Sequence, residues 1–227
     1  MFKEHEGADT EIRFGGGWET AWIVSERAAE TDDIDLHRTQ AYMLLSILLA
    51  RPPTQDLLDR LAGLRAGLRD DGSPVGRALA AIGDAAAATT ARDAEREFNR
   101  LFIGIERGEV VPYASYYLTG FLQGRPLIDI RTDMRGLGIT RGPGIPEPED
   151  HVAALAEIMA GLIDGRFGER HGAHDQRRFL ERHLAPWAPT FFTDLEQAAS
   201  AVLYRPVGAF GRLFLDIERD AFNLAET

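Results

Sequence analysis

Four ionisable residues stand close together at one point of the sequence: Glu147, Glu149, Asp150 and His151. They precede a run whose apolar residues recur at helical spacing, so they are predicted to lie at the start of a helix. Acids there complement the helix dipole, and aspartate is a favoured cap, which gives the cluster a structural explanation. The chemical alternative is that the carboxylates bind guanidinium groups, since a carboxylate accepts two parallel hydrogen bonds from an arginine. Periodicity does not choose between the two.

An acid–base pair of Asp150 and His151 is a less favoured, enzymatic interpretation of the same residues. A carboxylate can orient an imidazole for proton transfer. Adjacent residues of a helix diverge by about 100° around its axis, however, so they rarely face each other. A metal site is also disfavoured, because the histidine pair His171 and His174 flanks a glycine and has no predicted third ligand nearby. We expect neither a metal nor another bound cofactor.

An aromatic segment, Pro112-Tyr113-Ala114-Ser115-Tyr116-Tyr117, precedes this cluster in the chain. It is predicted to be turn-like at first and then helical. Its tyrosines are explained either by core packing or as the amphipathic wall of a binding site. Ser115 has neither the flanking glycines nor the preceding strand of a nucleophile elbow, so the sequence gives no support to a hydrolase.

Helical periodicity runs through almost the whole chain from residue 34 onwards. Caps are predicted at Thr54, at Ser73 before a proline, and at Thr90 with Asp93 three residues later. Apolar stripes predict four further helices. Two begin near Val152 and Phe179, the third runs from Phe191 to Val202, and the fourth runs from Val207 to about Leu224. No alternating run bounded by turns demands a sheet, so the predicted fold is all-α.

Residues 142–148 form the clearest interruption, because their three prolines lack amide donors and restrict the residues before them. We therefore expect one all-helical domain over residues 34–225, with a hinge at about 140–149 between two helical halves. Residues 1–33 are polar and interrupted by three consecutive glycines, and we expect them to form a flexible arm.

Composition narrows the classes of partner. The chain has 36 acidic and 25 basic residues, a net charge of −11, and no cysteine. A field of this sign repels phosphate, so nucleic acid is not expected to bind and basic partners are favoured. The absence of cysteine excludes a disulfide-stapled secreted fold. The uncharged, largely apolar run at residues 39–50 is shorter than the roughly 20 residues that cross a bilayer, so no membrane insertion is expected.

Three segments, in this order, resemble the TorD/DmsD family of chaperones for molybdenum-containing redox enzymes. The first is Glu97-Phe98-x-x-Leu101-Phe102-x-Gly104, followed by Pro112-Tyr113-x-Ser115-x-Tyr117; the second is Pro148-x-Asp150-His151; the third is Phe179-Leu180-x-x-His183-Leu184-x-x-Trp187. The resemblance covers roughly residues 35–220. The chain departs from the family after Gly104, where many members have proline and this sequence has Ile105.

The resemblance implies an all-helical, cytoplasmic protein without catalytic turnover. Its implied partners are the twin-arginine signal peptide and the apo form of a molybdopterin-containing catalytic subunit, held until the cofactor is inserted. By this resemblance Asp150 accepts an arginine, His151 positions the peptide, and Glu149 lies beside them. Tyr113, Ser115 and Tyr117 form an adjoining wall, which is supported by Glu97, Phe98, Phe102, Gly104 and Pro112. Both a monomer and a dimer are consistent with the sequence, and the alternative function is an adaptor for an amphipathic segment.

Overall fold

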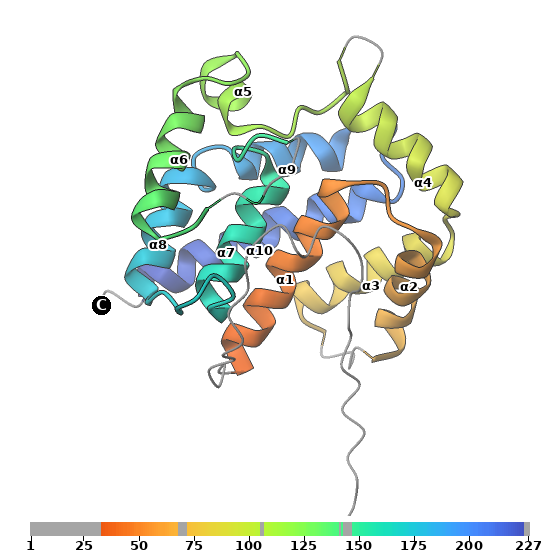
Figure 1. Cartoon of the computed structure of the whole chain (residues 1–227). Helices are drawn as coiled ribbons and strands as arrows, with labels where there is room; N and C mark the ends of the chain where they lie inside the picture. The colour runs from red at the N-terminus through yellow and green to blue at the C-terminus, as the bar shows by residue number, and fades with distance from the viewer. Residues whose placement is uncertain (1–32, 68–71, 105–106, 141, 143–146, 225–227) are drawn as a thin grey trace, which may run out of the picture.

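The computed structural model describes residues 33–67, 72–104, 107–140, 142 and 147–224, which fold into ten α-helices and one short π-helix (Figure 1). They are α1 (Asp33–Ala50), α2 (Gln55–Gly67), α3 (Pro74–Ala87), α4 (Ala91–Phe98), the π-helix η1 (Asn99–Ile103), α5 (Ala114–Thr119), α6 (Arg125–Gly136), α7 (Val152–Asp164), α8 (Ala173–His183), α9 (Ala188–Gln197) and α10 (Tyr204–Leu224). These residues contain no strand, and the all-α prediction is confirmed. The predicted arm lies outside them except for Asp33.

The helices begin at the caps that the sequence predicts. The Ser73 hydroxyl accepts a hydrogen bond from the Gly76 amide at 2.9 Å, and Pro74 occupies the first helical position. The Thr90 hydroxyl accepts from the Asp93 amide at 3.2 Å and donates to the Asp93 carboxylate at 2.7 Å. Each cap satisfies an amide that has no partner within its own helix.

The stripe predicted to continue from Phe191 to Val202 ends earlier, because α9 stops at Gln197 and Val202 is exposed. The reason lies in α4, whose buried Glu97 accepts hydrogen bonds from three successive amides at the start of α10. Glu97 Oε1 binds the amides of Val202 and Tyr204 at 2.7 and 2.8 Å, and Oε2 binds the amide of Leu203 at 3.0 Å. One carboxylate thus fixes a turn where the apolar pattern alone suggests a continuous helix.

Helix α7 lies in the interior, and its residues from Val152 to Ile163 are almost all buried (Figure 1). Apart from Glu157 and the terminal Asp164 its residues are apolar, as expected for a helix enclosed by others. Helix α1 packs along α7, and α10 packs along α9 and α3. Leu101 and Ile130, which precede the predicted hinge, share one hydrophobic core with Leu155 and Phe191, which follow it. The hinge itself stays a prediction.

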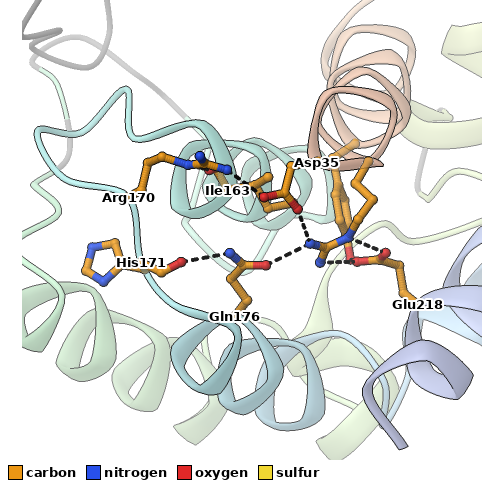
Figure 2. Close-up of polar contacts among 8 residues, drawn as sticks. Asp35, Ile163, Arg170, His171, Gln176 and Glu218 are labelled. Atoms are coloured by element: carbon orange, nitrogen blue, oxygen red, sulfur yellow. Dashed lines mark hydrogen bonds and ion pairs between the residues drawn. The ribbon is translucent and has the colours of Figure 1, made fainter. Parts of the chain in front are cut away.

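A partly buried ionic network joins α1, α8 and α10 (Figure 2). The Arg38 guanidinium donates from Nε and Nη2 to the two carboxylate oxygens of Glu218, at 2.7 and 2.9 Å. Its Nη1 donates to Asp35 and to the Gln176 amide oxygen, both at 2.9 Å. The Tyr42 hydroxyl donates to Glu218 at 3.0 Å. Since Glu218 is buried, these donors take the place of water around its carboxylate.

We expect Arg38→Leu to lower the free energy of unfolding by about 3 kcal/mol, because Glu218 would stay buried without its bidentate partner. The double variant Arg38→Leu, Glu218→Leu should recover much of that loss. The control is Arg60→Leu, which removes an exposed ion pair with Asp56 and should cost less than about 0.5 kcal/mol. Urea denaturation measures the free energy of unfolding of all three variants. Equal losses in Arg38→Leu and Arg60→Leu would contradict the role of Arg38 as the stabilising partner of Glu218.

We expect Glu97→Gln to lower the free energy of unfolding by about 2 kcal/mol, because a neutral amide satisfies the three backbone donors less well than a carboxylate. Hydrogen exchange should speed up at the amides of residues 202–204. The matched control, Glu95→Gln, changes an exposed residue of the same helix and should leave these amides protected. Equal protection in both variants would show that Glu97 does not hold this turn.

Candidate functional site

The predicted site residues meet where the chain enters α5 and α7. An isolated antiparallel bridge pairs Tyr113 with His151. In it the Ala114 amide donates to the Asp150 carbonyl, and the Val152 amide donates to the Pro112 carbonyl, both at 2.9 Å. Two motifs that are separate in the sequence are therefore joined by backbone hydrogen bonds.

Asp150 is only 1% exposed and caps α5 with its side chain. Its Oδ2 accepts a hydrogen bond from the Ser115 amide at 3.0 Å. The other oxygen, Oδ1, is buried and has no hydrogen-bond partner among the described residues. A buried carboxylate oxygen without a donor costs free energy, so this atom is one that a donor from a ligand would satisfy.

His151 caps α7 as a neutral imidazole. Its Nδ1 accepts a hydrogen bond from the Ala153 amide at 3.1 Å, which places the ring proton on Nε2. Burial lowers the pKa of His151 to about 4, although the charge of Glu147 acts in the opposite direction. Asp150 bonds to α5 and His151 bonds to α7, so the geometry of these two side chains is that of two helix caps rather than of an acid–base pair.

The two predicted wall tyrosines each donate to a carboxylate. The Tyr113 hydroxyl donates to the exposed Glu147, and the Tyr117 hydroxyl donates to Asp194 of α9 at 2.7 Å. Burial is the main cause that raises the pKa of both phenols, and these hydrogen bonds raise it further. Both side chains therefore remain protonated donors. The Tyr117 ring also lies against Trp187, with centroids 5.5 Å apart, and so joins α5 to the α9 side of the core.

Ser115 and Glu149 are buried, and both hold neighbouring elements in place. The Ser115 hydroxyl accepts a hydrogen bond from the Gly124 amide at 3.1 Å, which fixes the turn before α6. Oε2 of Glu149 accepts a hydrogen bond from Nε of Arg131 in α6 at 2.9 Å, and it forms an ion pair with Nη2 of the same guanidinium at 2.9 Å. Their side chains therefore line the interior of the site rather than its surface.

The predicted supporting residues divide between two places. Phe98 and Phe102 pack edge-to-face at 4.9 Å, and Phe102 packs against Tyr204 of α10 at 5.3 Å, beside the amides that Glu97 binds. Gly104 has a φ of +62°, and a Cβ there would meet the Arg107 carbonyl oxygen, so only glycine fits this turn. Pro112 instead reaches the start of α7 through its carbonyl.

The third motif links α8 to α6. His183 Nε2 lies 2.7 Å from the Asp133 carboxylate, and the Trp187 indole donates to the His183 carbonyl at 2.6 Å. Burial lowers the pKa of His183, although Asp133 opposes the shift. Trp187 is buried and belongs to the hydrophobic core.

Asp194 and Arg131 are site neighbours that the sequence analysis does not single out. Asp194 lies on the exposed side of the α9 stripe, 77 residues from Tyr117, and Arg131 lies 18 residues before Glu149. Nothing in their local patterns distinguishes them from other surface charges, so only the folded structure pairs them with the site.

Neither a metal site nor a membrane span is found in the described part of the chain. Over these residues no three His, Cys, Asp or Glu side chains gather in a way that could hold a metal ion. None of the described helices is both long and apolar enough to cross a membrane.

Known proteins resemble this chain in sequence and in fold. The sequence profile of the family described as "Nitrate reductase delta subunit" matches residues 69–193. "Chaperone protein TorD" of Vibrio cholerae serotype O1 is 28% identical over 134 residues, which are 56% of this chain and 61% of the relative's length. The TorD chaperone of Aliivibrio salmonicida is 24% identical over 211 residues, 87% of this chain and 89% of that relative.

The fold resembles the crystal structure of a candidate redox enzyme maturation protein from Archaeoglobus fulgidus. The TM-score is 0.57 at 17% sequence identity, and the match covers 85% of this chain and 99% of the other. At this identity the likeness concerns the fold alone.

We expect the folded protein to lose about 3 kcal/mol of stability through His151 as the pH falls from about 6.5 to 4. The folded pKa is depressed, so over this range the unfolded chain binds a proton at His151 that the folded chain excludes. His151→Asn keeps a capping side chain without a titrating ring. Urea denaturation against pH should therefore show a shallower decline for this variant, whereas exposed His174→Asn should match the original protein. If the free energy of unfolding fell equally with pH in the original protein, His151→Asn and His174→Asn, His151 would not be a buried neutral imidazole.

Proposed function

This chain belongs to the nitrate reductase delta subunit family, and on that premise we propose that it is a maturation chaperone for a molybdopterin-containing oxidoreductase. It binds the twin-arginine signal peptide, the apo form of the catalytic subunit, or both, until the cofactor has been inserted. Its TorD relatives, which are named as chaperones, support this proposal. Its place of action is the cytoplasm, where such a leader is present before export, and its role is binding without turnover.

The observation that carries the leader-binding proposal is the pair of carboxylates Asp150 and Glu147. Asp150 offers a buried oxygen without a donor among the described residues, and Glu147 is exposed. The Tyr113 hydroxyl donates to Glu147; burial is the main cause that raises the pKa of this phenol, and the charges of Glu147 and Asp150 raise it further. Tyr113 is therefore an electrostatic neighbour of both acids. A guanidinium has five donors in a planar fork and can serve two carboxylates at once.

Binding proceeds by exchange of donors at this pair. An arginine of the leader displaces the Tyr113 hydroxyl from Glu147 and donates to Glu147 and to Asp150 Oδ1. Because Asp150 is 1% exposed, the residues that cover it must move aside for the guanidinium to reach Oδ1. His151 anchors the backbone next to Asp150 and offers its Nε2 proton to the peptide. The net charge of −11 draws in the basic leader, and this attraction weakens with added salt.

We expect a synthetic leader with two arginines to bind at least about tenfold more tightly than the same peptide with two lysines, since an ammonium lacks the bidentate fork. Asp150→Asn should lower the affinity for the arginine peptide by about tenfold. This variant keeps an oxygen for the Ser115 amide and removes the negative charge, so it separates charge from folding. Isothermal titration calorimetry measures each affinity.

Glu169→Gln is the matched control for this experiment. It removes one negative charge from an exposed residue just beyond the end of α7, roughly 20 Å along that helix from Asp150. The control should bind the leader like the original protein. Equal affinity for arginine and lysine peptides, or equal losses in Asp150→Asn and Glu169→Gln, would sink the proposed guanidinium site.

A further inference from the structure

The turn between α5 and α6 presents large apolar side chains to solvent. Phe121 is 76% exposed, Leu122 57% and Leu118 43%, and Ile128 in the next helix is 62% exposed. The stretch from Leu118 to Gly124 contains no charged residue. Figure 1 shows α5 and the start of α6 at an upper edge of the molecule, where another protein can approach. Exposed apolar clusters of this kind mark interaction surfaces. We call residues 118–124 together with Ile128 the apolar turn.

Hydrogen bonds hold the apolar turn in one conformation. The Ser115 hydroxyl accepts from the Gly124 amide, and the Thr119 hydroxyl donates to the Ser115 carbonyl at 2.7 Å. The Phe121 amide donates back to the Thr119 hydroxyl at 3.3 Å. Gln123 has a φ of +57°, which a non-glycine residue adopts only where its surroundings impose it. A loop fixed in this way loses little conformational entropy when a partner binds.

Two arginines lie on or against the helices that carry the apolar turn, although the protein as a whole is acidic. The Arg107 guanidinium lies 5.4 Å above the Tyr116 ring of α5 and donates to its hydroxyl at 2.7 Å. Arg125 follows the uncharged stretch directly, and its side chain is 87% exposed. Its ion pair with Asp129, at 3.7 Å, is of the exposed kind that contributes little. A partner that complements this surface carries apolar side chains flanked by carboxylates, whereas a twin-arginine leader would meet like charges here.

We propose that the apolar turn docks an apolar, acid-flanked helix in the body of the client enzyme. The proposal rests on the proposed chaperone function and adds a second surface to it. The leader binds at Asp150 and Glu147, and the client body binds at Phe121 and Leu122. A chaperone with two separate surfaces holds its client at two points, which raises the overall affinity through effective concentration.

The test uses the full chain and two labelled amphipathic peptides of equal length, one of leucine and glutamate and one of leucine and lysine. The leucine–glutamate peptide should bind at least about tenfold more tightly. The double variant Phe121→Ser, Leu122→Ser should lower the affinity for this peptide by about tenfold or more, because two exposed apolar contacts are lost. Arg107→Gln with Arg125→Gln should reduce the preference for glutamate over lysine. Fluorescence anisotropy measures each affinity.

The control is Val202→Ser with Ile217→Ser, which removes two apolar side chains of comparable exposure elsewhere and should leave binding unchanged. Equal binding of the two peptides, or equal loss in the control and in Phe121→Ser, Leu122→Ser, overturns the proposal. Light scattering, which measures the oligomeric state, tests whether a second copy of this chain occupies the surface instead. A dimer of the original protein that becomes a monomer in Phe121→Ser, Leu122→Ser would assign the surface to a second copy and overturn the proposal.

The leader peptide distinguishes this proposal from the function on which it rests. Phe121→Ser with Leu122→Ser should bind the twin-arginine leader normally, and Asp150→Asn should bind the leucine–glutamate peptide normally. Failure of leader binding with intact peptide binding would count against the leader site alone. Failure of the leucine–glutamate peptide with intact leader binding would count against the apolar turn alone.

Discussion

The near-complete burial of α7 constrains the rest of the fold. Its first two residues, Val152 and Ala153, are buried, so their amides, which have no partner within the helix, must find partners inside the protein. The Val152 amide takes the Pro112 carbonyl, and the Ala153 amide takes the imidazole of His151. The chain before α5 is thereby tied to the start of α7. The position of the candidate site follows from this need to satisfy buried backbone donors.

Buried acids serve the same purpose elsewhere in this acidic protein. Glu97 gathers three amides at the start of α10, Asp150 holds an amide of α5, and Glu218 receives the guanidinium of Arg38. Each carboxylate joins elements that are remote in the sequence, and each depends on donors supplied by the other element. Part of the negative charge is therefore structural, and the exposed remainder is what a basic partner would meet.

Local signals in the sequence are enough to place most helices. Ser73 and Thr90 act on amides only three residues away, so their capping roles can be read without the fold. The early end of α9 cannot be read in this way, because Glu97 lies 105 residues before Val202. The site shows the same division. The prediction of an aspartate cap for the helix that follows the cluster is wrong in its residue, because His151 caps α7 and Asp150 instead binds an amide of α5, 35 residues earlier in the chain. The partners of Tyr113 and Tyr117 likewise depend on packing between distant segments.

Ser115 connects the two faces of the proposed chaperone within a single residue. Its amide is held by Asp150, and its hydroxyl holds Gly124 in the apolar turn. Only one residue therefore separates the Asp150 carboxylate from the apolar turn. Thermodynamic linkage requires that any coupling between the two surfaces act equally in both directions. A leader that engages Asp150 would alter the affinity for the client body by the same factor by which the client body alters the affinity for the leader.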